Sequence, residues 1–265
     1  MIKLIASDVD GTLVKDSSTE IYPEIIPVIR DLREKGVIFA IASGRQYNSI
    51  ANMFREIKDD LIFIAENGAH IRCRDTDMSV IKMNRPDAEE LIRDLRKYKD
   101  CDFVVSAPGI SYMESTNPEF QDLIINGYHN NVKIVSDAAK ITEDIIKIAV
   151  YRKKSIRDIG ESVLIPKWKD KVHCCMAGEE WVDFIDSKVD KGNALGTVMD
   201  FFHILPEETM AFGDNGNDIG MLERADESYA VDTATEEVKV HARHVCGSWR
   251  TKGVLNVLKE LRKTC

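Results

Sequence analysis

The sequence has no long hydrophobic segment, and this excludes one class of protein. None of its apolar runs approaches the ~20 residues that a helix needs to cross a bilayer. A signal peptide is also missing from the sequence, because Met1-Ile2-Lys3 leads directly into a short apolar run and then Asp8. We therefore expect a cytoplasmic protein without a membrane partner.

Basic residues are in the minority. The 265 residues include 36 Lys and Arg against 45 Asp and Glu, which gives a net charge of −9. Non-specific binding to nucleic acids or membranes usually relies on a basic stripe. We expect no nucleic-acid partner, and an anionic substrate must be bound by a few placed cations or by a metal ion.

Cysteine patterns that indicate a metal site or a disulfide scaffold are also lacking. No pair has C-x-x-C spacing, and the chain is too long for a disulfide scaffold. Cys174 and Cys175 are neighbours in a strand-like run, where adjacent side chains point to opposite faces. We expect reduced thiols at all six positions: Cys73, Cys101, Cys174, Cys175, Cys246 and Cys265.

The sequence does contain an alternation of apolar runs and amphipathic segments. Continuous apolar runs at 4–6, 37–42 and 61–65 are typical of strands buried on both faces. Apolar residues at helical spacing lie between these runs, first over 23–34 and then at Ile50, Met53, Phe54 and Ile57. Strands that alternate with helices predict a doubly wound parallel α/β sheet.

A different pattern interrupts this rhythm. It begins with a predicted hairpin over 69–83 and a helix from about Ala88 to Tyr98, with start signals at Pro86 and Asp87. We expect further strands at 103–106, 110–114 and 146–151, helices near 119–126 and 156–165, and a hairpin over 172–186. The α/β rhythm resumes with helices at 193–202, 219–224, 235–242 and 254–263 and strands at 209–213 and 228–231. The prediction is an α/β core, residues 1–83 and 187–265, with an inserted α+β domain at 84–186.

Two carboxylates follow the first predicted strand. Side chains two residues apart in extended chain point the same way, so Asp8 and Asp10 should face one spot at the carboxyl end of the sheet. Ligands bind there in open α/β folds. Like charges this close raise each other's pKa unless a proton or cation compensates, and Mg²⁺ favours carboxylate oxygens. The alternative is a solvated turn with two incidental aspartates.

Polar groups also follow three other predicted elements. They are Ser43-Gly44 after the second strand, Lys191 where the α/β rhythm resumes, and 214–218 after a later strand. Strand ends in a doubly wound sheet lie along one edge, so we expect these groups to converge with the aspartate pair. Together they provide a carboxylate nucleophile, a second acid, a hydroxyl beside a glycine N–H, and an ammonium group. This set suits phosphoryl transfer.

In these motifs the chain resembles the haloacid dehalogenase superfamily of phosphatases, specifically the Cof-type branch with a class IIB cap. The matches run in the family's order: Asp8-Val-Asp10-Gly-Thr, Ile41-Ala-Ser43-Gly-Arg, Asp190-Lys191-Gly192 and Gly213-Asp214-Asn-Gly-Asn217-Asp218. Asn67-Gly68-Ala69, ahead of the insert, is also typical. Several motifs at fitting intervals are more specific than any one. The stretch Lys188-Val189-Asp190 departs from the pattern, because a Gly-containing turn is common there.

The resemblance implies roles for the aspartates. Asp8 would attack phosphorus and become an aspartyl-phosphate. Asp10 would protonate the leaving oxygen and then activate the hydrolytic water. Mg²⁺ would be held by the Asp8 carboxylate, the Asp10 backbone carbonyl and Asp214.

The resemblance also implies how the phosphoryl group is bound. Ser43 and the Gly44 N–H would hold it, while Lys191 would neutralise its charge and fix Asp8. Asn217 matches a position that commonly contacts phosphate. Asp218 would be an acid behind the metal ligands.

Four of these polar residues also have plainer explanations. Lys191 alone would be a solvated lysine at a helix start. Ser43 alone would be an N-cap, and Asp218 would cap the helix that follows it. Arg45 would pair with a carboxylate rather than meet substrate.

The sequence thus predicts a Mg²⁺-dependent phosphatase acting on a small phosphate ester, such as a sugar phosphate, and forming a monomer or a weak homodimer. Asp10 favours hydrolysis, because the transport ATPase branch has threonine there. The alternatives are a phosphotransferase or phosphomutase on the same scaffold, and a non-catalytic protein that binds a phosphorylated ligand. Loops 107–112 and 177–181 are candidates for substrate selectivity, although Tyr112 and Trp181 are better explained as packing residues.

Overall fold

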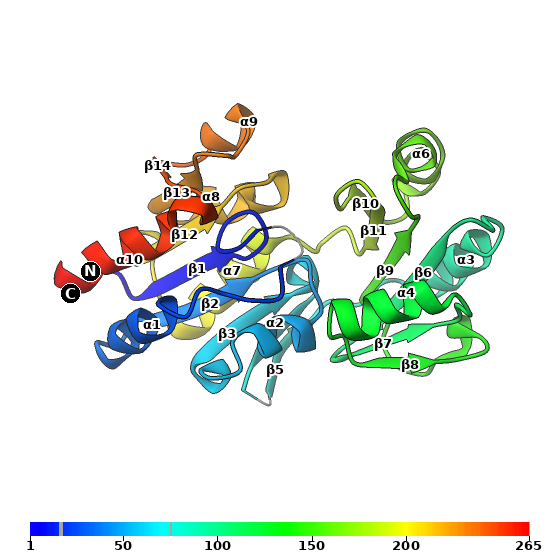
Figure 1. Cartoon of the computed structure of the whole chain (residues 1–265), viewed down its shortest axis with the longest axis horizontal. Helices are drawn as coiled ribbons and strands as arrows, with labels where there is room; N and C mark the ends of the chain where they lie inside the picture. Colours follow the sequence, from blue (N-terminus) through cyan, green and yellow to red (C-terminus); the bar gives the residue numbers. More distant parts are fainter. Residues whose placement is uncertain (16–17, 75, 265) are drawn as a thin grey trace. The chain divides into compact units, whose positions relative to one another are not determined.

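The computed structural model describes residues 1–15, 18–74 and 76–264 (Figure 1). Within them the chain forms two compact units, each built on its own sheet. The first unit is Met1–Ser79 with Asp190–Cys265, and the second is Val80–Val189. No described helix is both long and apolar enough to cross a membrane.

An eight-stranded sheet forms the centre of the first unit. Its strand order is β14-β13-β12-β1-β2-β3-β4-β5. The pairs from β14 to β3 are parallel, whereas β4 runs antiparallel to β3. The strands are β1 (Leu4–Asp8), β2 (Ile38–Ala42), β3 (Leu61–Ala65), β4 (His70–Cys73), β5 (Thr76–Val80), β12 (Thr209–Gly213), β13 (Glu227–Val231) and β14 (His244–Cys246). This parallel core with its hairpin confirms the predicted fold class.

The central strands are apolar because they are covered on both faces. Every residue of β1, β3 and β12 is buried. Helix α1 contacts α10, and α7 contacts α8 (Figure 1). Helix α1 connects β1 to β2, and helix α8 connects β12 to β13, which lies in the opposite direction along the sheet. Because both crossovers are right-handed, α1 and α8 lie on opposite faces of the sheet. The helices are α1 (Ile25–Glu34), α2 (Tyr47–Met53), α7 (Lys191–Phe202), α8 (Ile219–Arg224), α9 (Glu236–Lys239) and α10 (Gly253–Thr264), with short turns η1 (Lys58–Asp60), η2 (Glu66–Gly68), η6 (Pro206–Glu208), η7 (Gly216–Asp218) and η8 (Trp249–Thr251).

Strand β1 lies where the winding direction reverses, between β2 and β12. In open α/β sheets such a reversal leaves a crevice at the carboxyl ends of the two strands. Asp8 is the last residue of β1, and Asp214 directly follows β12. The topology therefore brings together carboxylates that are separated by about 200 positions in the sequence.

The second unit contains a six-stranded sheet of order β10-β11-β9-β6-β7-β8. Its pairs are antiparallel except for β7 with β8. Leu91, Ile92 and Trp168 pack on one face, and Phe120 and Ile124 belong to a separate cluster. The elements are α3 (Arg85–Leu95), β6 (Asp102–Ala107), β7 (Ile110–Met113), α4 (Pro118–Asp122), η3 (Leu123–Gly127), β8 (Val132–Ile134), η4 (Ala138–Lys140), β9 (Lys147–Tyr151), α5 (Arg157–Ile159), η5 (Gly160–Leu164), α6 (Ile165–Trp168), β10 (His173–Met176) and β11 (Trp181–Ile185).

Several local predictions are wrong. Helix α3 begins at Arg85, because the Asn84 side chain caps it by accepting a 3.2 Å hydrogen bond from the Asp87 backbone N–H. It ends at Leu95 rather than near Tyr98. The sequence patterns missed β8 and β14, which have three residues each. The helical segments expected near 119–126 and 156–165 are present, as α4 with η3 and as α5 with η5 and α6. Helix α9, by contrast, stops at Lys239 and does not reach residue 242.

The two aromatic residues of the candidate selectivity loops are packing residues. Tyr112 is 2% exposed and belongs to the core of the second unit. Trp181 lies among aromatic rings, with ring centroids 4.9–6.2 Å from those of Phe120, Tyr128 and Tyr151. Both side chains therefore stabilise the insert.

The cysteines of the described chain are free thiols: Cys73, Cys101, Cys174, Cys175 and Cys246. Burial raises the pKa of Cys101, Cys174 and Cys175 to about 12, and that of Cys246 to about 11. These four thiols are therefore protonated at neutral pH. Cys265 lies outside the described residues.

Candidate active site

Asp8 ends β1 and is 5% exposed. Its Oδ1 accepts a 2.7 Å hydrogen bond from Nζ of Lys191. Its Oδ2 is buried and has no hydrogen-bond partner among the described residues. A buried carboxylate oxygen without a partner costs stability, so this atom is better explained by a ligand than by folding.

Lys191 is the first residue of α7 and is only 1% exposed, so the explanation as a solvated lysine is wrong. Nζ also donates a 2.7 Å hydrogen bond to Oδ1 of Asp218. Burial alone would lower the pKa of Lys191, but the carboxylates of Asp218 and Asp8 outweigh it and raise the pKa. Lys191 is therefore a permanent ammonium group between two carboxylates.

The turn before Lys191 forms without glycine. The carboxylate of Asp186 accepts a 3.0 Å hydrogen bond from the Lys188 N–H. Its backbone carbonyl accepts another, also 3.0 Å, from the Val189 N–H. Asp190 then caps α7 by accepting from the Asn193 N–H at 2.9 Å. An aspartate side chain thus supplies the turn for which the resemblance suggested a glycine.

Asp218 has two functions in the structure. It is 0% exposed, and its Oδ2 accepts hydrogen bonds from the backbone N–H groups of Asp214 and Asn215 at 3.0 and 3.1 Å. The prediction that Asp218 caps the helix that follows it is wrong, because its side chain makes no cap hydrogen bond to α8 and instead closes the turn η7 before it. Its other oxygen accepts from Lys191, so the same side chain fixes both the loop after β12 and the buried ammonium.

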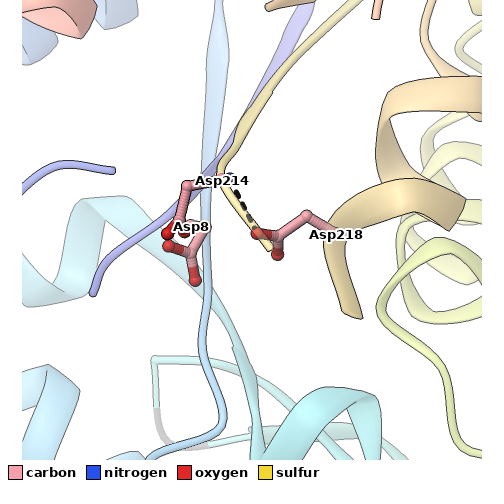
Figure 2. Close-up of side chains that lie close together, drawn as sticks. All are labelled: Asp8, Asp214 and Asp218. Atoms are coloured by element: carbon pink, nitrogen blue, oxygen red, sulfur yellow. Dashed lines mark hydrogen bonds between the residues drawn. The ribbon is translucent and has the colours of Figure 1, made fainter. Parts of the chain in front are cut away.

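Three carboxylates gather at this point. Asp8, Asp214 and Asp218 offer oxygens that lie within 4.8 Å of one another, and Figure 2 shows them on two strand ends and one helical turn. Burial, and then the charges of Asp218 and Asp214, raise the pKa of Asp8 well above its usual range, although Lys191 opposes them. A divalent cation would relieve this repulsion.

The donor set fits a magnesium ion. Asp8 Oδ2 has no hydrogen-bond partner among the described residues, whereas the two oxygens of Asp218 already accept three hydrogen bonds. Oxygen ligands, few of them from the protein, are what Mg²⁺ requires. Asp8 and Asp214 are therefore suited to bind the ion directly, with Asp218 behind them.

Asp10 lies apart from that cluster and is paired with Arg45. Nε of Arg45 donates to Oδ2 of Asp10 at 2.7 Å, and a second nitrogen of the guanidinium donates to Oδ1. The side chain of Arg45 is 9% exposed, and that of Asp10 is 29% exposed. The plainer explanation of Arg45, that it pairs with a carboxylate, is thus confirmed. Such a two-point pair fixes the position and orientation of the Asp10 carboxylate.

Ser43 and Gly44 follow β2. Ser43 is 1% exposed, its N–H donates to the Ile64 carbonyl at 2.9 Å, and its Oγ accepts from the Arg45 N–H at 3.1 Å. The hydroxyl thus closes a turn and does not cap a helix, because Gln46 stands at the N-cap of α2. Its hydrogen is still able to donate.

Two residues of the site were not recognised in the sequence. Thr12 is fully buried, and its Oγ1 donates to Oδ1 of Asp214 at 3.1 Å, so it orients a candidate metal ligand. Its position in the Asp8-Val-Asp10-Gly-Thr motif was the available signal. Asn67 accepts a 3.0 Å hydrogen bond from the side chain of Asn217.

Comparison with known proteins identifies the family. A family model described as haloacid dehalogenase-like hydrolase matches residues 5–258. The chain belongs to this family. Membership confirms the predicted family and the predicted enzyme class, a phosphatase of the haloacid dehalogenase type.

Relatives of this haloacid dehalogenase-like chain include named phosphatases. The 5-amino-6-(5-phospho-D-ribitylamino)uracil phosphatase YbjI of Escherichia coli is 25% identical over 99% of this chain and 97% of the relative. The HMP-PP phosphatase of Citrobacter koseri is 24% identical over 97% of this chain and 95% of the relative. A solved structure from Eubacterium rectale is 38% identical, with a TM-score of 0.88 over 98% of this chain and 99% of that one. The subclass IIB sugar phosphatase BT4131 has the same fold, with a TM-score of 0.82 over 98% of both chains and 22% identity.

Proposed function

We propose that the protein is a Mg²⁺-dependent phosphatase that hydrolyses small phosphorylated metabolites through an aspartyl-phosphate on Asp8. The observation that carries this proposal is the state of that carboxylate. One of its oxygens is held by a buried ammonium group, and the other is buried without a hydrogen-bond partner among the described residues. A nucleophile needs this combination of fixed orientation and an available oxygen.

Asp8, Asp214 and the backbone carbonyl of Asp10 would hold the metal ion. When bound, the ion would neutralise charge between the attacking carboxylate and the phosphoryl oxygens. Thr12 and Asp218 would keep Asp214 in place through the side-chain and backbone hydrogen bonds described above.

In the first step an oxygen of Asp8 attacks phosphorus, and the bond from phosphorus to the leaving oxygen breaks. Asp10 donates a proton to that oxygen. In the second step water attacks the same phosphorus, Asp10 takes the proton from the water, and the bond to Asp8 breaks. Hydrogen bonds from Ser43, the Gly44 N–H and Asn217, together with the charge of Lys191, would stabilise the transferring group.

Asp10 can donate a proton only after its pairing with Arg45 changes. The guanidinium occupies both carboxylate oxygens in the structure, and a proton on either oxygen competes with that contact. We therefore include the opening of this pair in the catalytic cycle. Arg45 holds the acid in place until substrate arrives.

The substrate is a small metabolite with a phosphate monoester, such as a sugar phosphate. Two of the relatives are named for a phosphoribityl compound, and another is named for HMP-PP, so the relatives differ in substrate but share this ester or anhydride chemistry. We propose the inserted unit as the cap, whose loops distinguish one leaving group from another.

The proposal is tested by phosphate release from a panel of phosphorylated sugars, polyols, nucleotides and cofactors, including 5-amino-6-(5-phospho-D-ribitylamino)uracil. Each compound is assayed with Mg²⁺ and with EDTA, for wild type and for Asp8→Asn. We expect metal-dependent release that Asp8→Asn abolishes. Absence of release from every compound by folded wild type contradicts the proposal. Transfer to an added sugar without phosphate release would instead identify a phosphotransferase.

A further inference from the structure

The turn after β3 has an unusual backbone. Glu66, Asn67 and Gly68 have successive φ angles of 51°, 58° and 103°. Positive φ is unfavourable for a residue with a side chain, less so for asparagine. Two such residues in a row persist only when their surroundings hold them.

Neighbouring strand ends hold this turn through its backbone. The N–H of Glu66 donates to the carbonyl of Arg45, and the N–H of Asn67 donates to the carbonyl of Ser43, both at 3.0 Å. The segment after β2 and the turn after β3 are therefore tied together directly at the proposed phosphate site.

The side chain of Asn67 lies against two residues proposed to bind phosphate. It is 7% exposed, and its Oδ1 accepts a 3.0 Å hydrogen bond from Nδ2 of Asn217. A Cβ added at Gly44 would lie 3.1 Å from Oδ1 and 3.4 Å from Nδ2 of Asn67. The amide of Asn67 thus occupies the space beside the Gly44 backbone and contacts the exposed Asn217 at the same time.

Gly68 connects the same turn to the segment of Lys191, the third group proposed to bind phosphate. A Cβ at this position would lie 2.7 Å from the carbonyl oxygen of Asp190 and 3.0 Å from Cβ of Ala194. The turn therefore packs against the first turn of α7, which begins with Lys191. One three-residue turn contacts all three segments that carry the candidate phosphate ligands.

We propose that Asn67 is a positioning residue for the phosphoryl group. Its amide fixes the orientation of Asn217, and the second N–H of that side chain then donates to a phosphoryl oxygen. Burial and backbone hydrogen bonds hold Asn67, whereas Asn217 is exposed and takes its orientation from this contact. The inference rests on the proposed function, because it assigns the anion at this site as the phosphoryl group of substrate.

Asn67→Gly tests the side chain without disturbing the backbone, because glycine adopts φ near 58° without strain. We expect KM for the best substrate and Ki for inorganic phosphate to rise together, each about tenfold, with kcat changed less than threefold. This pattern indicates loss of an interaction made equally in the ground and transition states. His203→Gly is the matched control. His203 also has positive φ (55°), but it lies at the opposite end of α7, so KM and Ki should not change.

A double-mutant cycle separates positioning from general damage. Asn217→Ala should raise both constants by a similar factor, and adding Asn67→Gly to it should cause no further increase. An undiminished effect of Asn67→Gly in the Asn217→Ala background overturns the proposal. A rise of less than twofold in KM and Ki of the Asn67→Gly single variant also overturns it.

Asn67→Asp provides a second test if Asn67→Gly does not fold. Aspartate also tolerates positive φ and has the same size, but it places an anion beside Gly44. We expect Ki for phosphate to rise at least tenfold, and an unchanged Ki contradicts the proposal. Failure of the proposed function gives a different result, because wild type itself would then release no phosphate from any compound.

Discussion

Asp8 couples the charge of the site to the stability of the fold. Its folded pKa is raised by burial and by the neighbouring carboxylates of Asp218 and Asp214, whereas an unfolded aspartate titrates near ~3.9. Between these two pKa values the folded state binds more protons at this position than the unfolded state. Stability of the metal-free protein therefore falls as pH rises through this window.

Asp8→Asn should remove this penalty. In EDTA the variant should match wild type in Tm near pH 4 and exceed it by about 2–4 °C at pH 8, on the order of 1 kcal/mol for a chain of this size. Saturating Mg²⁺ should raise the Tm of wild type at pH 8 and leave that of the variant nearly unchanged. Thermal unfolding across pH, with and without Mg²⁺, provides the measurement. A variant less stable than wild type at pH 8 in EDTA contradicts the assignment.

Asp10 offers a kinetic test at the same scale. With p-nitrophenyl phosphate the leaving group needs no proton, so the proposed mechanism still allows phosphorylation of Asp8 in Asp10→Asn. Hydrolysis then lacks its base. We expect a rapid burst of about one p-nitrophenol per enzyme, followed by turnover at least 100-fold slower than wild type. Stopped-flow absorbance measures both phases, and steady turnover without a burst argues against a base at this position.

At the scale of elements, the turn after β1 is shaped by its neighbour across the sheet. Gly11 has φ of 86°, and a Cβ there would lie 2.2 Å from Oδ2 of Asp214. Gly36 has a similar φ, 89°, with nothing within 4 Å of its Cβ position. The two glycines share the same backbone requirement, but only one contacts a candidate metal ligand.

Gly11→Ala and Gly36→Ala therefore form a matched pair. Each should lose about 1–2 kcal/mol of unfolding free energy, because alanine is strained at positive φ. Only Gly11→Ala should also raise the Mg²⁺ concentration for half-maximal activity, by tenfold or more, because it displaces Asp214. Magnesium titrations of the two variants make the comparison, and equal Mg²⁺ requirements would exclude Asp214 as a ligand.

The success of sequence analysis also differs among elements. The continuous apolar runs located β1, β2, β3 and β12, because burial on both faces leaves a clear signal in the sequence. The edge strand β14 and the short β8 have no such signal, since their pairing depends on partners distant in sequence.

The sequence predicted some features of the candidate site and not others. Motif order indicated that Asp8, Lys191 and Asp214 belong together, but no local property of Lys191 indicates that it is buried. The pairing of Arg45 with Asp10 and that of Asn67 with Asn217 depend on side-chain direction at neighbouring strand ends. Spacing along the chain does not determine such directions.

At the scale of the whole molecule, the described residues proposed to bind metal and phosphate belong to the first unit. Hydrogen exchange should show this directly. Mg²⁺ should slow amide exchange in peptides from 4–14 and 209–218, while peptides from 85–185 exchange as they do in EDTA. Mass spectrometry of the exchanged protein distinguishes this result from uniform protection, which would place metal ligands in the second unit as well.

The division at Val80 and Val189 has an evolutionary consequence. The polypeptide passes between the two units only at these two junctions, and each unit has its own hydrophobic core. Mutations that change the insert therefore leave the strands and loops that carry the aspartate cluster unchanged. After gene duplication, one copy can acquire a new insert surface while it inherits the reaction chemistry unchanged, and diversification of such enzymes requires few compensating mutations in the core.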